Sequence, residues 1–123
     1  MQVEIWSDVV CPWCAIGKRR FETALADFEH RDEVEVRYRS FELDPTTPRT
    51  VEGNATQRLA DKYGVPLAQA EAMQQRVIEQ AAGEGLDFRF DQARPGNTVD
   101  AHRLLHLAAD RGRQAELKER LLL

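Results

Sequence analysis

The sequence predicts an α/β fold in which a short strand–helix–strand unit precedes a helical segment of about 70 residues. Hydrophobic residues alternate in two short stretches, residues 2–6 and 33–39, as they do in strands. Between these stretches the apolar period becomes helical, and it becomes helical again after the loop DPTTPRT at 44–50. With 123 residues and a mass of 14.1 kDa, the chain can bury one modest core as a single domain.

The first three elements form a βαβ unit. Val3 and Ile5 lie on one side of the first predicted strand, QVEIW. A helix is expected to begin at the cysteines and to run to about residue 29, because a proline in the first helical turn lacks only an N–H that would have no partner there. The second strand, EVEVRYR, is extended by Phe41 and Leu43. Strand, helix and strand in this length predict a right-handed parallel crossover.

The rest of the chain is divided into helices by glycine and proline. Helices are predicted at 55–63, at 66–82, from Asn97 or Thr98 to 111, and from there to the last residues. The long helix has an expected buried stripe, formed by Leu67, Ala70, Met73, Val77 and Ile78. The segment LDFRF, 86–90, is expected to be extended. We therefore assign residues 1–45 to an N-terminal βαβ unit and residues 46–123 to a helical segment.

Composition and charge exclude several classes of protein. Hydrophobic residues make up 42% and charged residues 31%, which is typical of a globular protein. A net charge of -4 argues against general nucleic-acid binding. No apolar run approaches the roughly 20 residues that a membrane span needs. The N-terminus lacks a basic leader, so a cytoplasmic location is expected.

The two cysteines, Cys11 and Cys14, are the strongest chemical signal. In a reducing compartment a closely spaced pair favours catalysis or metal binding over a structural disulfide. A cysteine at a helix N-terminus meets unpaired N–H groups and the positive end of the helix dipole, which favour its thiolate. We therefore interpret Cys11 as a nucleophile and Cys14, one helical turn later, as the thiol that resolves a mixed disulfide.

Two other interpretations of the cysteines stay open. Together with His102 and His106 they match the two half-patterns of a Cys2His2 zinc site, which would make the chain a zinc-binding helical module. However, about 90 residues separate the halves, against about a dozen in a zinc finger. The cysteines could also be two inert core residues, since free cysteine is often a small hydrophobe.

Neighbouring residues give weaker signals. Trp13, between the cysteines, suits either substrate contact or packing. Asp8 is interpreted as a turn or capping residue rather than a proton acceptor. The run Lys18, Arg19 and Arg20 is expected to form a solvated helix face.

Three segments carry a family resemblance. The run SDVVCPWCAIGKRRFETAL, the run FELDP at 41–45 and the run NTVDAHRLLHLA at 97–108 together resemble the FrnE branch of the DsbA-like thioredoxin-fold proteins. This branch is similar to the 2-hydroxychromene-2-carboxylate isomerases and the kappa-class glutathione transferases. The resemblance extends from Val3 to the last residues.

The resemblance implies a thioredoxin-like β-α-β start with an all-helical insertion. It implies protein-disulfide oxidoreductase activity through Cys11 and Cys14, shaped by Pro12 and Trp13, without metal or nucleotide. The expected partners are proteins with thiols or disulfides, or glutathione as a co-substrate; no nucleic acid or membrane is expected, and a homodimer is one allowed arrangement. Four residues of the third segment are implied to lie beside the site: Asn97, Thr98, His102 and Arg103.

The resemblance also implies an alternative and a departure. In the isomerase and transferase relatives, serine takes the place of Cys11 and glutathione is the cofactor, so a glutathione-dependent isomerase or transferase is a further hypothesis. The family continues with further strands, a proline loop beside the cysteines and a closing helix. Two strands are few for a stable open sheet. We therefore expect the C-terminal strands of the fold to be missing from this chain.

Overall fold

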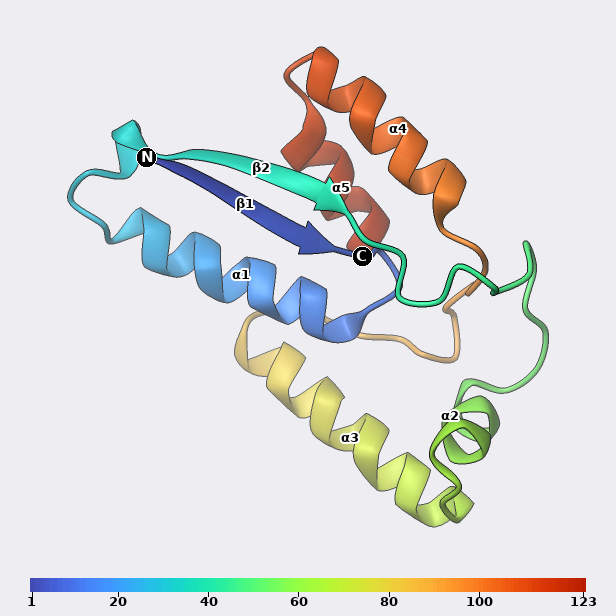
Figure 1. Cartoon of the computed structure of the whole chain (residues 1–123). Coiled ribbons are helices and arrows are strands. Elements are labelled where there is room, and N and C mark those ends of the chain that lie inside the picture. The colour runs from blue at the N-terminus through green and yellow to red at the C-terminus, as the bar shows by residue number, and fades with distance from the viewer.

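A computed structural model describes residues 1–123 and shows an α/β fold (Figure 1). Two parallel strands and the helix between them come first, and four more helices follow, as the sequence predicts. The elements are β1 (Gln2–Ser7), α1 (Pro12–Ala26), a 3-10 turn (Arg31–Glu33), β2 (Glu35–Ser40), α2 (Ala55–Tyr63), α3 (Leu67–Gly83), α4 (Val99–Asp110) and α5 (Gln114–Leu122).

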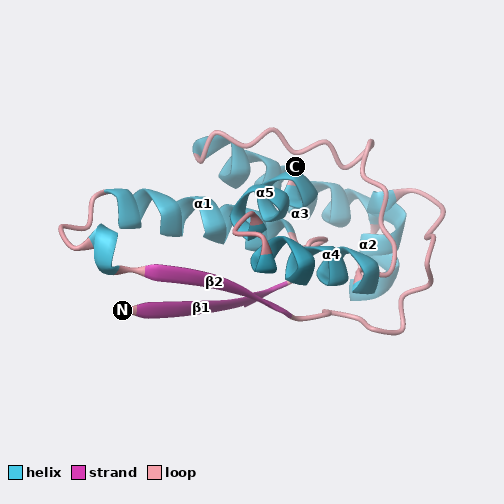
Figure 2. Cartoon of the chain, turned by 90° about the horizontal axis from the view of Figure 1, so that it is seen from above, coloured by secondary structure: helices cyan, strands magenta, loops and turns pink.

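The sheet consists of β1 and β2 in parallel register. Gln2 lies opposite Glu35, and Ser7 lies opposite Ser40. Figure 2 shows the two strands along one margin of the molecule. The return from β1 to β2 runs through α1, which is the predicted crossover. Both cysteines therefore lie at the carboxyl end of β1, where the chain leaves the sheet and enters α1.

Local interactions explain where the elements differ from the predicted bounds. Helix α1 ends at Ala26, earlier than the expected residue 29, because the backbone closes a turn from Phe28 N to Leu25 O at 3.1 Å. Strand β2 begins at Glu35, later than expected, because the preceding residues form the 3-10 turn. The turn brings the carbonyl of Glu33 to 2.6 Å from the amino group of Met1.

The core lies between α1 and the helical segment. Ala15 and Ile16 of α1 pack with Ala81 of α3 and with Leu86, surrounded by the partly buried Val77, Phe88 and Leu122. Residues 86–90 form no strand, and their burial alternates because Leu86 and Phe88 face this core. The two assigned segments thus share one core, and the division at residue 45 stays a prediction.

Helix α3 buries most of its predicted stripe, with one exception. Ala70 is fully buried, and Met73, Val77 and Ile78 are partly buried. Leu67 is about half exposed, against expectation, because it occupies the first residue of the helix. None of the helices combines the length and the apolar character that crossing a membrane requires.

Candidate functional site

The two cysteines lie at the N-terminus of α1, half-buried and both as free thiols. Cys11 is the N-cap residue, with an extended backbone (φ -101°, ψ 115°), and Pro12 follows in the first helical turn. The backbone N–H of Cys14 donates to the carbonyl of Cys11 at 3.0 Å, which closes that turn. The predicted start of the helix at the cysteines is therefore confirmed.

The two sulfurs have opposite acidities. The Cys14 thiol donates to the Cys11 sulfur, and this bond, with backbone N–H groups of Cys14 and Trp13, lowers the pKa of Cys11 to about 6 against burial and the charge of Asp8. The pKa of Cys14 is raised, because its proton is held by Cys11 and because it is buried. Near neutral pH, Cys11 is therefore the thiolate and Cys14 the thiol.

Asp8 is a buried carboxylate at the end of β1, with 2% of its surface exposed. Its oxygens accept from the backbone N–H groups of Val9 and Leu43, each at 2.8 Å, and Oδ1 lies 3.0 Å from Nε2 of His102. Burial raises the pKa of Asp8, but hydrogen bonds from Leu43, Thr98, Val9 and His102 outweigh it and hold that pKa below its usual value. The bond to Val9 is local, whereas the bonds to Leu43 and His102 join Asp8 to distant segments, so the predicted turn or capping role describes only part of what Asp8 does.

The predicted site block on α4 divides into two groups. Thr98 and His102 are buried and contact Asp8. Asn97, rather than Thr98, bonds the start of α4, because its Oδ1 accepts from Val99 N at 3.0 Å. Arg103 is exposed and pairs with Asp100 at 3.2 Å on the helix surface, so it points away from the buried Asp8–His102 pair.

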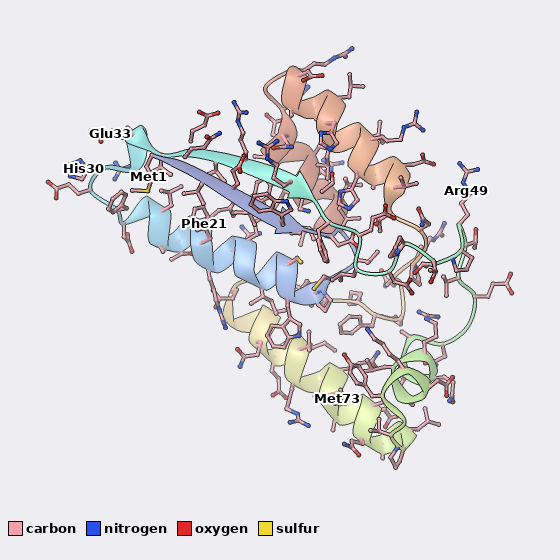
Figure 3. The ribbon with its side chains drawn as sticks, in the orientation of Figure 1. Met1, Phe21, His30, Glu33, Arg49 and Met73 are labelled. Carbon is pink, nitrogen blue, oxygen red and sulfur yellow. The ribbon has the colours of Figure 1, made fainter.

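The residues of the zinc alternative do not converge. Nε2 of His106 lies 2.9 Å from the hydroxyl of Ser40 at the surface, while His102 contacts Asp8. Nowhere do three His, Cys, Asp or Glu side chains take up a metal-binding arrangement. His30 lies with Met1 and Glu33 at the far end of the sheet (Figure 3).

The basic run on α1 forms ion pairs with glutamates of α1, of α5 and of the turn after α3. The prediction of a solvated helix face is therefore wrong for Lys18, which is buried. Lys18 is buried and pairs with Glu22 at 2.6 Å and with Glu119 of α5. Burial lowers the pKa of Lys18, yet its two glutamate bonds outweigh burial and raise it. Arg19 also pairs with Glu119, and Arg20 pairs with Glu84, at 2.6 Å. Packing of α5 and of the residues after α3 onto α1 explains the burial.

A cavity of about 740 Å³ opens beside Cys11. Its walls include Cys11 and Pro12, the loop before α4, and the last residues of α5. Arg49 also borders it, although its side chain is largely exposed and pairs with Asp100 of α4 at 3.0 Å. Trp13 is about half exposed next to the cysteines. Cys11 is therefore bordered by open space on this side.

One residue of the site has no signal in the sequence. Lys118 of α5 is almost completely buried, and its ammonium donates to the carbonyls of Asp8 at 3.2 Å and of Ser7 at 3.5 Å. From the sequence KERLLL alone, Lys118 would be predicted to lie on the solvated face of a helix. Only the packing of α5 against the end of β1 reveals its place.

Comparison with known proteins agrees with this geometry. The sequence matches the family model of the DSBA-like thioredoxin domain over residues 2–122. The chain belongs to this family. The crystal structure of the probable DsbA oxidoreductase SCO1869 from Streptomyces coelicolor superposes on this DSBA-like domain with a TM-score of 0.92 and 50% sequence identity.

The match to the solved structure covers 99% of this chain and 52% of that chain, so the DSBA-like domain described here spans about half the length of its solved relative. The uncharacterized protein YwbO of Bacillus subtilis (strain 168) is 39% identical over 46 residues, which are 37% of this chain and 21% of that protein.

Proposed function

We propose that this DSBA-like domain is a thiol–disulfide oxidoreductase, with Cys11 as the nucleophile and Cys14 as the resolving thiol. The observation that carries the proposal is the opposite acidity of the two sulfurs at the start of α1. Cys11 has a pKa lowered to about 6 by the bond from Cys14 and by backbone N–H groups, whereas the pKa of Cys14 is raised. The Cys11 thiolate can attack a disulfide, whereas Cys14 stays protonated until the mixed disulfide has formed.

The exchange takes two steps. The Cys11 thiolate attacks a substrate disulfide, forms a mixed disulfide and expels one substrate thiolate, which takes up a proton. Cys14 then loses its proton and attacks the Cys11 sulfur, which releases the second substrate thiol. The substrate disulfide is reduced, and the cysteine pair is oxidised. The reverse sequence transfers the disulfide to a substrate dithiol.

The acidity of Cys11 bears on the direction of exchange. A lowered pKa stabilises the reduced form and makes the oxidised pair a stronger oxidant. We therefore propose that the oxidised pair donates its disulfide to substrate thiols, since the pKa of Cys11 is lowered.

We further propose that the chain belongs to the FrnE branch and acts in the cytoplasm on thiols of proteins or on glutathione. The flanks of CPWC and the NT-x2-AHR block support the branch, and the similarity to the probable DsbA oxidoreductase of Streptomyces coelicolor supports the oxidoreductase class. Cys11 stands where the isomerase and transferase relatives carry serine, which favours redox chemistry over isomerisation.

A redox titration in glutathione buffers tests the proposal. We expect one reversible two-electron transition in the unsubstituted protein, detected by alkylation of the free thiols at each glutathione ratio. Cys11→Ser should abolish exchange, whereas Cys14→Ser should accumulate a mixed disulfide between Cys11 and glutathione. If no transition appears and both cysteines of the native protein resist alkylation, the two residues are inert and the proposal is wrong.

A further inference from the structure

Lys118 holds a buried positive charge without a carboxylate bonded to it. It is the largest of the fully buried side chains, with 1% of its surface exposed. Its ammonium donates to two backbone carbonyls, those of Ser7 and Asp8, and lies 5.8 Å from the centre of the Tyr38 ring. Removing an ammonium from water is costly unless something compensates it. A charge kept here is therefore expected to act on a neighbouring group.

The neighbouring group that changes charge during exchange is the sulfur of Cys14. The ammonium of Lys118 contacts the backbone carbonyl of Asp8, three residues before Cys11, and Cys14 lies in the first turn of α1, which begins there. The charge of Lys118 favours the thiolate of Cys14. Lys18, the other buried lysine, pairs with two glutamates, which neutralise its charge.

We propose that Lys118 is a positioning residue that stabilises the thiolate of Cys14 when Cys14 resolves the mixed disulfide. This inference rests on the proposed function. In the mixed disulfide, Cys11 no longer carries the negative charge that holds the Cys14 proton. Cys14 releases this proton to solvent, its thiolate attacks the Cys11 sulfur, and the substrate thiolate leaves and is protonated in turn.

The charges around Lys118 are consistent with this role. Burial lowers the pKa of Lys118, while Cys14, Asp8 and Cys11 favour its charged form and Lys18 opposes it. His102 pairs with the Asp8 carboxylate, and Tyr38 lies beside the ammonium as a phenol whose pKa is raised by burial. In turn, the charge of Lys118 opposes the rise of the pKa of Cys14. Coupling of this kind is reciprocal.

Stopped-flow reaction with 5,5′-dithiobis(2-nitrobenzoate) separates the two steps. Reduced protein should release one thionitrobenzoate when Cys11 attacks and a second when Cys14 resolves. In Lys118→Met we expect the second phase to slow about threefold at pH 7 and its pH profile to move about one unit upward. A one-unit rise cuts the thiolate fraction about tenfold, and the remaining thiolate becomes about threefold more nucleophilic.

The controls separate charge from packing. The first phase should change little in Lys118→Met, and Lys118→Arg, which keeps the charge, should restore the pH profile of the second phase. Lys62→Met removes an exposed lysine from α2 and should leave both phases unchanged. An unchanged second-phase profile in folded Lys118→Met would overturn the inference. Absence of a second phase in the unsubstituted protein would overturn the proposed function itself.

A second measurement avoids the risk that Lys118→Met does not fold. In Cys11→Ala with ¹³C-labelled lysine, ionisation of Cys14 should appear as an inflection in the Cε resonance of Lys118, at the same pH as the thiolate absorbance of Cys14. The reciprocity of the coupling requires this shared inflection. A Lys118 resonance that ignores the ionisation of Cys14 would overturn the inference.

Discussion

The hydrogen bond from Cys14 to Cys11 should decide how much thiolate the reduced protein carries. With a pKa of about 6, Cys11 is about 90% ionised at pH 7, whereas a thiol at the ordinary value of 9.0 is about 1% ionised. Cys14→Ala removes the hydrogen-bond donor that lowers the pKa of Cys11 most. The backbone N–H groups still lower this pKa, while burial and the charge of Asp8 raise it. We expect the pKa of Cys11 to rise to about 7 or above, so that at most about half of it is ionised at pH 7.

Thiolate absorbance in the ultraviolet, titrated from about pH 4 to about pH 10, measures this change. Cys14→Ser is the matched control, because its hydroxyl can still donate to the Cys11 sulfur, and it should titrate below the alanine variant. Cys11→Ser reports the signal of Cys14 alone, whose pKa should fall once the Cys11 thiolate no longer holds its proton, although burial still raises it. Equal titration midpoints for Cys11 in the alanine and serine variants would refute the assignment of the lowered pKa to this bond.

Three further predictions concern the reduction potential and stability. The lowered pKa of Cys11 stabilises the reduced form at high pH, and this stabilisation is lost as the pH falls through about 6. At pH 7 it should raise the midpoint reduction potential by about 30 mV over that of a thiol with a pKa of 9.0. A midpoint potential that does not follow the ionisation of Cys11 would contradict this prediction. Asp8→Ala should cost about 3–5 kcal/mol of unfolding free energy in urea, because His102 and two backbone donors lose a buried acceptor. The lowered pKa of Asp8 means that this contribution is present above the unfolded pKa and lost as the pH falls through the folded one, so a cost unchanged in strong acid would contradict it. Gly96→Ala places a Cβ against the carbonyl oxygen of Arg49 and should lower the melting temperature by separating two loops; an unchanged temperature would show that these loops yield freely.

The fold could be predicted because its periodicities are local. Alternation and the 3.6-residue repeat identify β1, β2 and the five α-helices, and most bounds agree within a few residues. The ends of α1 and β2 were displaced, because a turn and a 3-10 helix stabilised by backbone bonds occupy residues that the pattern assigned to regular elements. Residues 86–90, expected to be extended, pair with no strand, and Leu86 and Phe88 pack into the core instead.

The cysteines of the site could be predicted, whereas the charges around them could not. A CxxC motif at a strand-to-helix junction predicts thiol chemistry from adjacent residues alone. The NT-x2-AHR block predicts that Thr98 and His102 lie beside the site. The burial of Lys18 and Lys118 depends on how α5 packs against α1 and β1, which is tertiary information. A lysine is expected at the surface, so its burial is visible only in three dimensions.

The two assigned segments divide the labour of the site unequally. The N-terminal unit supplies both sulfurs and the Asp8 carboxylate, whose charge opposes ionisation of Cys11. The helical segment supplies Thr98 and His102, which bond that carboxylate, and Lys118, whose charge favours a thiolate. The first segment alone would therefore place a buried carboxylate beside the sulfurs with no cation to offset it. The helices after residue 45 therefore complete both the core and the electrostatic surroundings of the cysteines.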